Sequence, residues 1–443
     1  MTHPITKLGC WLLGAGCWAL ACSAVDAAEQ NTRNLFAELL GKSEAETTAL
    51  VESTWQQFTH GDPKTERLYY EVGDDLAYIA DIGSQDVRSE GMSYGMMIAV
   101  QLGQREQFDR LWRWAKRYMQ HPADSPRRGY FAWQCRFDGT QIDPGSASDG
   151  EAWFATALFF AAHRWGHSID TAEGRVRPPA EPPRMPAADS ARPEASPYPR
   201  ADSIDYLADA QALLRAMRDD DRGGAITSIF DLERRQIVFA PTRDGAQLTD
   251  PSYHLPHFLE LWARWDADPA GRAFWRECVD ESRAFLRRAA HPDTGLMSEY
   301  AHFDGRPYTE TTFGAGKGDF RYDAWRILAN VAVDHAWFAA DPWQVEQSNR
   351  VLRFLKRQGR EFVDQYTLDG RPLSKDPSIG LGATAAVAGL AADPKLARPF
   401  VQRLWKAPTP TGQWRYYNGL LVMLGRLQAG GRFQAYHPAT PET

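Results

Sequence analysis

Cysteine is scarce in this chain of 443 residues, which contains five. Three of them, Cys10, Cys17 and Cys22, fall near the N-terminus, so the rest of the chain has only Cys135 and Cys278. Two cysteines make no disulfide scaffold; in an oxidising compartment they either bond to each other or stay as buried thiols. Neither has a second thiol or a histidine at metal-ligand spacing, which argues against a zinc site.

Runs of one charge sign, phosphate-binding loops and paired histidines are missing as well. The 50 Lys and Arg and the 57 Asp and Glu give a net charge of −7, and no basic run could follow a nucleic-acid backbone. No glycine-rich loop follows a predicted strand, and the 11 histidines are scattered. We therefore expect no nucleic-acid partner, no metal and no other cofactor.

A single long apolar run, from Leu8 to Val25, follows Lys7. It has the pattern of a secretory signal peptide; the small residues Val25 and Ala27 favour cleavage after Ala27, with cleavage after Ala28 as the alternative. A transmembrane anchor and a lipoprotein signal that leaves Cys22 lipidated are the alternatives. We expect a periplasmic or secreted monomer, with no membrane partner once residues 1–27 are removed.

Apolar residues recur at helical spacing through most of the remaining chain. Only 67–82 has the pattern of strands, with Gly73, Asp74 and Asp75 as the turn of a β-hairpin. About a dozen helices joined by loops rich in Gly, Pro and Asp predict an all-α (α/α)6 toroid, a ring of six helical hairpins, with a small β-hairpin near the N-terminus. An α-solenoid is the alternative, although the segments differ too much to be repeats. The predicted helices are 35–40, 45–58, 94–102, 108–119, 149–165, 204–218, 255–264, 271–289, 320–339, 344–358, 381–391, 396–405 and 414–428.

Prolines crowd the stretch 171–201, where they alternate with Ala, Arg and Glu. This composition predicts a disordered surface insertion. Because helical patterns of the same character continue after it, we expect one catalytic domain over 28–443; two domains joined by a linker are the alternative.

Three carboxylic acids lie at or near the starts of predicted helices. Glu90 lies among small residues, Asp149 follows Ser148 with capping-box spacing, and Asp323 lies three residues before Arg326, within reach of an ion pair. The helix dipole should favour the ionised form of Asp149. Each acid alone also fits a structural role. In a toroid, however, the N-terminal ends of the inner helices collect on one face, so we expect the three acids to converge.

Paired carboxylic acids are what glycosidic hydrolysis requires, because one protonates the leaving oxygen and the other activates water. The 16 Trp and 16 Tyr suit the apolar faces of sugar rings. Aromatic residues near the acids are expected to line a sugar-binding cleft; they are Tyr94, Tyr130, Phe131, Trp133, Trp153, Tyr253, Tyr322 and Trp325.

Four motifs together resemble glycoside hydrolase family 8: Ser-Glu-Gly-Met-Ser-Tyr-Gly-Met-Met at 89–97, Gly-Tyr-Phe-Ala-Trp-Gln at 129–134, Ser-Asp-Gly-Glu at 148–151 and Tyr-Asp-Ala-Trp-Arg at 322–326. The resemblance implies an (α/α)6 toroid that inverts the anomeric centre. By position it implies that Glu90 is the general acid, that Asp323 is the base, and that Asp149 positions the sugar. The substrate-binding residues expected beside these acids are Trp133, Tyr94, Tyr253, Arg326 and Tyr130.

Within the family, the segments 69–75, 131–135 and 253–256 are most similar to oligoxylanases that release xylose from the reducing end of β-1,4-xylo-oligosaccharides. Exo action in that group depends on a loop with a His-Pro segment, but the corresponding stretch 373–378 is Leu-Ser-Lys-Asp-Pro-Ser, without His. Endo cleavage of β-1,4-xylan or β-1,4-glucan is therefore an alternative. A polysaccharide lyase would need a basic cluster that we do not find, and a carbohydrate-binding toroid without catalysis would not need all three acids.

Overall fold

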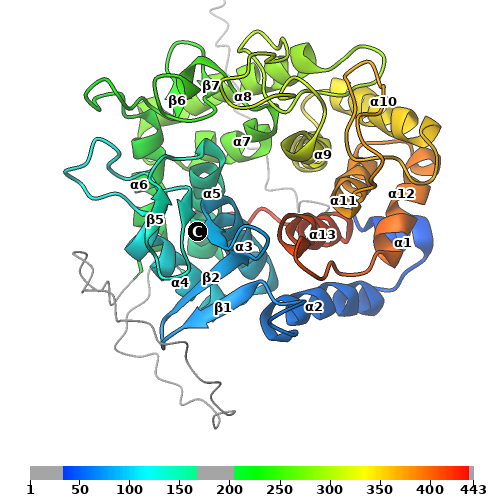
Figure 1. Cartoon of the computed structure of the whole chain (residues 1–443), viewed down its shortest axis with the longest axis horizontal. Coiled ribbons are helices and arrows are strands. Elements are labelled where there is room, and N and C mark those ends of the chain that lie inside the picture. The colour runs from blue at the N-terminus through cyan, green and yellow to red at the C-terminus, as the bar shows by residue number, and fades with distance from the viewer. Residues whose placement is uncertain (1–32, 167–203, 439–443) are drawn as a thin grey trace, which may run out of the picture.

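The computed structural model describes residues 33–166 and 204–438. Figure 1 shows the helices arranged as a ring, with α3, α5, α7, α9, α11 and α13 inside and the other helices around them. The predicted (α/α)6 toroid is therefore confirmed. The α-helices are α1 (Leu35–Leu40), α2 (Glu44–His60), α3 (Ser89–Leu102), α4 (Arg105–Trp114), α5 (Ser148–Trp165), α6 (Tyr206–Arg218), α7 (Pro256–Trp265), α8 (Pro269–Ala289), α9 (Trp325–Phe338), α10 (Trp343–Arg357), α11 (Ile379–Val387), α12 (Pro394–Lys406) and α13 (Arg415–Ala429).

The inner helices are buried on nearly every side. Every residue of α5 from Ser148 to Ala162 is buried, whereas outer helices such as α8 bury only one stripe. A helix that is apolar all round is stable only where other elements surround it. The inner ring therefore supplies the core, and its helix ends supply the floor of the site described below.

A small antiparallel sheet covers one side of the ring. The predicted hairpin is present as β1 (Tyr69–Val72) and β2 (Leu76–Asp81), with Gly73 in the left-handed region at a φ of 61°. The sheet continues in the order β1-β2-β3-β4-β5 through β3 (Asp86–Arg88), β4 (Gln134–Cys135) and β5 (Gln141–Asp143). A second pair is formed by β6 (Phe230–Asp231) and β7 (Gln236–Ile237). The sequence did not predict β3 to β7, because strands of two or three residues are too short to show an alternating pattern.

Several predicted helices begin or end at other residues in the structure, and two of these differences affect the site. The helix expected from residue 94 begins at Ser89, so Glu90 belongs to its first turn. The helix expected over 320–339 is a 3₁₀ turn, Tyr322–Ala324, followed by α9.

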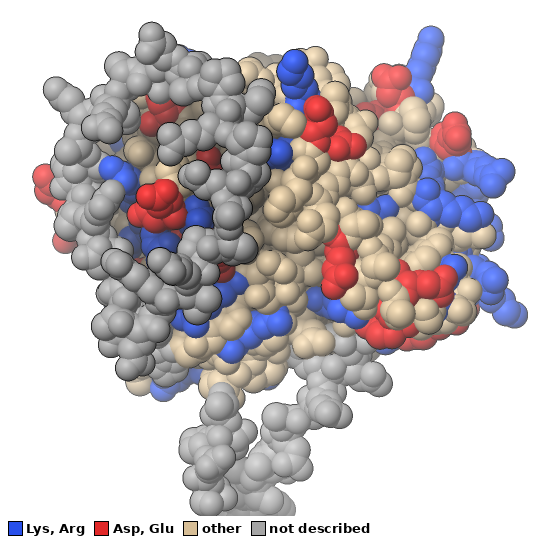
Figure 2. Space-filling model, turned by 90° about the horizontal axis from the view of Figure 1, so that it is seen from below, with Lys and Arg blue, Asp and Glu red and all other residues tan. Residues whose placement is uncertain are grey.

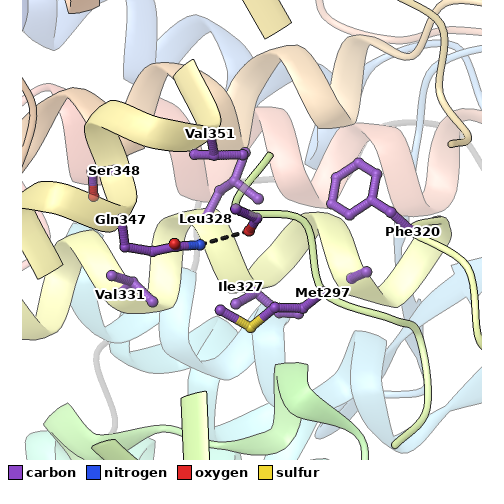
Figure 3. A pocket seen from close by; sticks show the side chains of 10 residues that line it. Met297, Phe320, Ile327, Leu328, Val331, Gln347, Ser348 and Val351 are labelled. Atoms are coloured by element: carbon purple, nitrogen blue, oxygen red, sulfur yellow. Dashed lines mark hydrogen bonds between the residues drawn. The ribbon is translucent and has the colours of Figure 1, made fainter. Parts of the chain in front are cut away.

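The packing between α9 and α10 is almost entirely apolar. Figure 3 shows Ile327, Leu328 and Val331 of α9 facing Val351 of α10, and the Gln347 amide donates a hydrogen bond to the Gly295 carbonyl at 2.6 Å. The cavity left there has a volume of about 10 Å³, which is room for a single water molecule and not for a sugar.

Several predictions concern residues outside those described: the signal peptide, its alternatives and the proline-rich insertion. Among residues 33–166 and 204–438, no helix combines the length and the apolar character that a membrane span requires. Cys135 and Cys278 are both buried as free thiols. Figure 2 shows acidic and basic side chains interspersed over the described part of the face seen from below.

Candidate active site

One cleft of about 840 Å³ contains all three predicted acids among its lining residues. Glu90 comes from the first turn of α3, Asp149 from the first turn of α5, and Asp323 from the 3₁₀ turn before α9. The expected convergence of the acids at the starts of inner helices therefore occurs. The individual roles of the three acids remain predictions.

Two glycines explain why these helix starts can meet. A side chain at Gly91 would place its Cβ 2.6 Å from the ring of Tyr416, and one at Gly150 would lie 2.7 Å from the Ser89 hydroxyl. Both distances are shorter than real Cβ contacts allow. Gly91 thus lets Tyr416 reach Glu90, and Gly150 lets α5 approach α3 closely.

Arg326 is the centre of the site. Its Nη1 donates to Glu90 Oε2 at 2.8 Å, to Asp149 Oδ2 at 2.9 Å and to the Tyr94 hydroxyl at 2.9 Å. Its Nη2 lies 3.3 Å from Asp323 Oδ1 and 2.8 Å from the Ser252 hydroxyl. The expected ion pair with Asp323 is present, but it belongs to a buried network and not to a surface pair.

Glu90 has the environment of a proton donor. Its Oε1 accepts a hydrogen bond from the Tyr416 hydroxyl at 3.1 Å, and its side chain is 18% exposed. Burial raises the pKa of Glu90 to about 7; the charges of Asp323 and Asp149 act in the same direction, and Arg326 opposes them. A carboxylic acid with this pKa still holds its proton near neutrality, as a general acid must.

Asp149 differs from the expectation in two respects. The residue that caps α5 is Ala147, whose side chain makes no cap, and the Ser148 hydroxyl is buried without a hydrogen-bond partner, so the capping box does not form. Burial raises the pKa of Asp149 to about 6 despite the adjacent Arg326. Burial has the largest effect on the pKa of Asp149, so its position at a helix start does not by itself set that pKa.

Asp323 is the most exposed of the three acids at 25%, against 5% for Asp149. Two nitrogens of one guanidinium are about 2.3 Å apart. The nearest oxygens of Glu90 and Asp323 therefore lie no more than about 8.4 Å from each other, which is compatible with the roughly 6.5–9.5 Å of inverting glycosidases.

Two further acids with raised pKa values, Asp250 and Glu299, lie at this site and were not predicted. Asp250 is fully buried, with its Oδ2 3.8 Å from Arg326 Nη2, and burial followed by the charge of Asp323 raises its pKa well above the usual range. Glu299 lines the cleft and binds Lys317 Nζ at 2.7 Å; burial and the charge of Asp323 raise its pKa to about 7. The sequence signal was weak, because Asp250 lies only three residues before Tyr253 and resembles an ordinary turn residue.

Of the eight aromatic residues that we expected to line the cleft, four do so. These are Trp133, Tyr253, Tyr322 and Trp325. The ring of Tyr253 also lies 5.5 Å below the Arg326 guanidinium. Three aromatic residues near the start of α13, Trp414, Tyr416 and Tyr417, line the cleft without having been predicted; the Trp414 side chain is 69% exposed.

The other four predicted aromatics lie in the core. Tyr130 is fully buried; its hydroxyl donates to the Thr227 carbonyl at 3.1 Å, and the Arg222 guanidinium covers its ring at 3.7 Å. Its prediction as a sugar-binding residue was therefore wrong. Tyr94 is buried and touches the site only through its hydrogen bond from Arg326, so it supports the network instead of facing a sugar. Phe131 and Trp153 are buried as well.

The ring of Trp133 and the acid on α3 share a backbone connection. The Ser89 amide donates to the Trp133 carbonyl at 3.0 Å, and the Trp133 amide donates to the Gly145 carbonyl at 2.7 Å. Strands β3 and β4, which directly adjoin Ser89 and Trp133 in the sequence, pair through Arg88 and Gln134. The small sheet therefore fixes Trp133 relative to Glu90.

The loop 373–378 meets the cleft at its C-terminal end. Pro377 and Ser378 line the cleft, whereas Leu373 is 41% exposed. This loop therefore forms part of the wall at one end of the cleft.

Comparison with known proteins agrees with this geometry. The model of glycosyl hydrolases family 8 matches residues 75–174 and 239–431. The chain belongs to glycoside hydrolase family 8. This family-8 protein is 42% identical over 408 residues to the reducing-end xylose-releasing exo-oligoxylanase Rex8A of Paenibacillus barcinonensis, a match that covers 91% of this chain and 96% of that protein.

Two solved structures of family 8 are similar to this one. A mutant of Rex8A complexed with 3(3)-alpha-L-arabinofuranosyl-xylotetraose has a TM-score of 0.80 at 40% identity, covering 93% of this chain and 98% of that chain. A catalytic mutant of a xylanase from Teredinibacter turnerae, complexed with xylohexaose, has a TM-score of 0.80 at 38% identity, covering 92% of this chain and 98% of that chain.

Proposed function

We propose that this protein hydrolyses β-1,4-xylo-oligosaccharides with inversion and releases xylose from the reducing end. The observation that carries the proposal is that Glu90 and Asp323 bind two nitrogens of the same guanidinium, Arg326, in one cleft lined with aromatic rings. The similarity to Rex8A, whose name describes this activity, supports the choice of substrate.

Glu90 donates its proton to the glycosidic oxygen as the bond breaks. Its pKa of about 7 keeps a large share of it protonated at neutral pH. The negative charge that it gains lies 2.8 Å from Arg326 Nη1, which stabilises it.

Asp323 accepts the proton of the water that attacks the anomeric carbon from the opposite face. It acts as a carboxylate, consistent with its ion pair with Arg326. Tyr253, whose ring lies beside the guanidinium, bounds the space for this water. Asp149 holds hydroxyls of the sugar at the cleavage site, and Trp133 supports a neighbouring ring by stacking.

Endo cleavage of xylan is a second candidate, and the loop 373–378 favours it. The loop lacks the His of the expected His-Pro segment, and the solved xylanase complex with xylohexaose is about as similar to this chain as Rex8A is. The two activities differ in where a long chain is cut, so product analysis distinguishes them.

The test is incubation with xylotetraose labelled at the reducing end, and in parallel with polymeric xylan, followed by anomer-resolved NMR. Exo action predicts labelled xylose as the first product, with the new reducing end of xylotriose in the α configuration. A rapid fall in xylan viscosity would establish endo action instead. A β-configured new end would contradict inversion, and no cleavage of either substrate would contradict the proposed function.

We further propose that the mature protein begins after Ala27 and acts as a monomer in the periplasm or outside the cell. The apolar run 8–25 supports this. Mass spectrometry of the protein from fractionated cells tests the cleavage, and light scattering tests the monomer; an intact N-terminus on cytoplasmic protein would contradict the localisation.

A further inference from the structure

A second groove, here named the basic groove, opens beside the catalytic cleft where α10, α11 and α12 meet on the right of the ring in Figure 1. Its volume of about 820 Å³ is similar to that of the cleft. Pro377 and Asn418 line both. The catalytic cleft and the basic groove therefore adjoin at these two residues.

The walls of the basic groove are strongly cationic. Its lining includes Lys356, Arg360, Arg403 and Lys406, and only one acid, Glu361. Lys356, Arg360 and Lys406 are exposed, and Arg403 is half-buried. In the part of the chain that the structure describes, none of the four cations forms an ion pair, although ion pairs are common elsewhere on the surface. These charges are therefore available to an external anion.

The floor of the basic groove includes two buried aromatic residues. Phe362 and Phe400 are buried with their rings 6.1 Å apart. The Arg403 guanidinium lies over the ring of Phe362 at 4.7 Å, and its Nη1 donates to the Arg360 carbonyl at 3.0 Å. These two contacts fix the orientation of Arg403 and leave its other donors for a ligand.

We propose that the basic groove binds a carboxylate-bearing sugar unit, a uronosyl residue carried by the same xylan chain that enters the cleft. A sugar acid offers an apolar ring face to the floor and a carboxylate to the cationic walls. Because Pro377 and Asn418 line both sites, one chain bound in the cleft would have its next units close to the basic groove. This inference rests on the proposed function for the identity of the chain.

The test is calorimetric binding of glucuronoxylan fragments to the full-length Glu90→Gln protein, which should not consume them. The matched ligand is the same preparation after chemical reduction of its carboxyl groups. We expect the acidic fragments to bind more tightly than the reduced ones at low salt, and the difference to shrink at high salt. Equal affinity for the two preparations would overturn the proposal.

Substitutions in the basic groove test whether the acidic fragments bind there. Lys356→Gln/Lys406→Gln changes only exposed side chains, and Arg403→Gln is made separately because it could disturb packing. Each should weaken binding of the acidic fragments by about three- to tenfold and leave the reduced fragments unaffected. Lys395→Gln, which removes an exposed charge from α12 outside the groove, is the matched control. Loss of affinity in the control alone, or unchanged affinity in the exposed double variant, would overturn the assignment.

Cleavage of neutral xylotetraose by the unmodified protein separates this inference from the proposed function. The groove variants should cleave that substrate at an unchanged rate. If the unmodified protein cleaves no xylo-oligosaccharide, the proposed function is wrong. The charge-dependent binding measurements still show whether the basic groove binds acidic sugar units.

Discussion

The substitution Glu90→Gln should make the protein more stable and almost inactive. In the folded protein the pKa of Glu90 is raised from 4.5 to about 7, mainly by burial. Between these two pH values the unfolded chain releases the proton while the folded chain keeps it, so stability falls as the pH rises through this window. Above pH 7 the loss is complete and amounts to on the order of 3 kcal/mol.

A glutamine avoids this loss because it has no charge to bury. Its carbonyl oxygen can accept from Arg326 Nη1 where Oε2 does now, and its amide can donate to the Tyr416 hydroxyl with the direction of that hydrogen bond reversed. The free energy of unfolding of Glu90→Gln should therefore exceed that of the unmodified protein at pH 8 and equal it below pH 4.

Turnover should change in the opposite direction. Removal of a general acid lowers kcat by about 10² to 10⁴ on a xylo-oligosaccharide, but it should have little effect on a xylobiosyl substrate whose leaving group needs no proton. Denaturant titrations at several pH values, together with kinetics on both substrates, measure the two effects. Glu52→Gln, on an exposed position of α2, is the control and should change neither. Equal loss of rate on both substrates, or lower stability of Glu90→Gln at pH 8, would refute this account of Glu90.

Four other outcomes are expected. Asp323→Asn should lower kcat at least as much as Glu90→Gln. A substrate with an activated leaving group should not restore kcat, because the attacking water still lacks a base. Recovery of kcat on such a substrate would contradict the role of Asp323 as the base. Asp149→Asn should reduce turnover and leave weak residual activity. It should also move the alkaline limb of the pH–rate profile to lower pH, because one charge that raises the pKa of Glu90 is lost. An unchanged alkaline limb would show that Asp149 does not affect the pKa of Glu90. Trp133→Ala should raise KM about tenfold or more, as expected for one lost stacking contact, and unchanged KM would remove it from the sugar site. Tyr130→Phe should leave KM unchanged and lower stability by about 1 kcal/mol, because its hydroxyl bonds a backbone carbonyl in the core; stability is measured by thermal unfolding.

The sequence predicted the helices well because their apolar periodicity is long and regular. It also predicted that Glu90, Asp149 and Asp323 would meet, since all three lie at starts of inner helices. It could not predict Asp250 as a fourth acid beside Arg326, because that contact depends on the closure of the ring and not on local pattern.

Neighbouring aromatic residues were harder to assign to the cleft or the core. Trp133 and Tyr130 are three residues apart, yet Trp133 lines the cleft and Tyr130 lies under Arg222. The direction of a side chain in an irregular segment depends on its hydrogen bonds to distant strands, which composition does not reveal. The upward shift of the pKa of Asp149 was missed for a related reason, because burial cannot be read from its position at a helix start.

The strand pair β3–β4 links the start of α3, which carries the proposed proton donor Glu90, to Trp133, the ring proposed to support a sugar. Through the hydrogen bond from Ser89 to Trp133, any shift of the sugar platform carries the start of α3 with it. Two short strands therefore keep the proposed acid and the proposed sugar-stacking ring in register with each other.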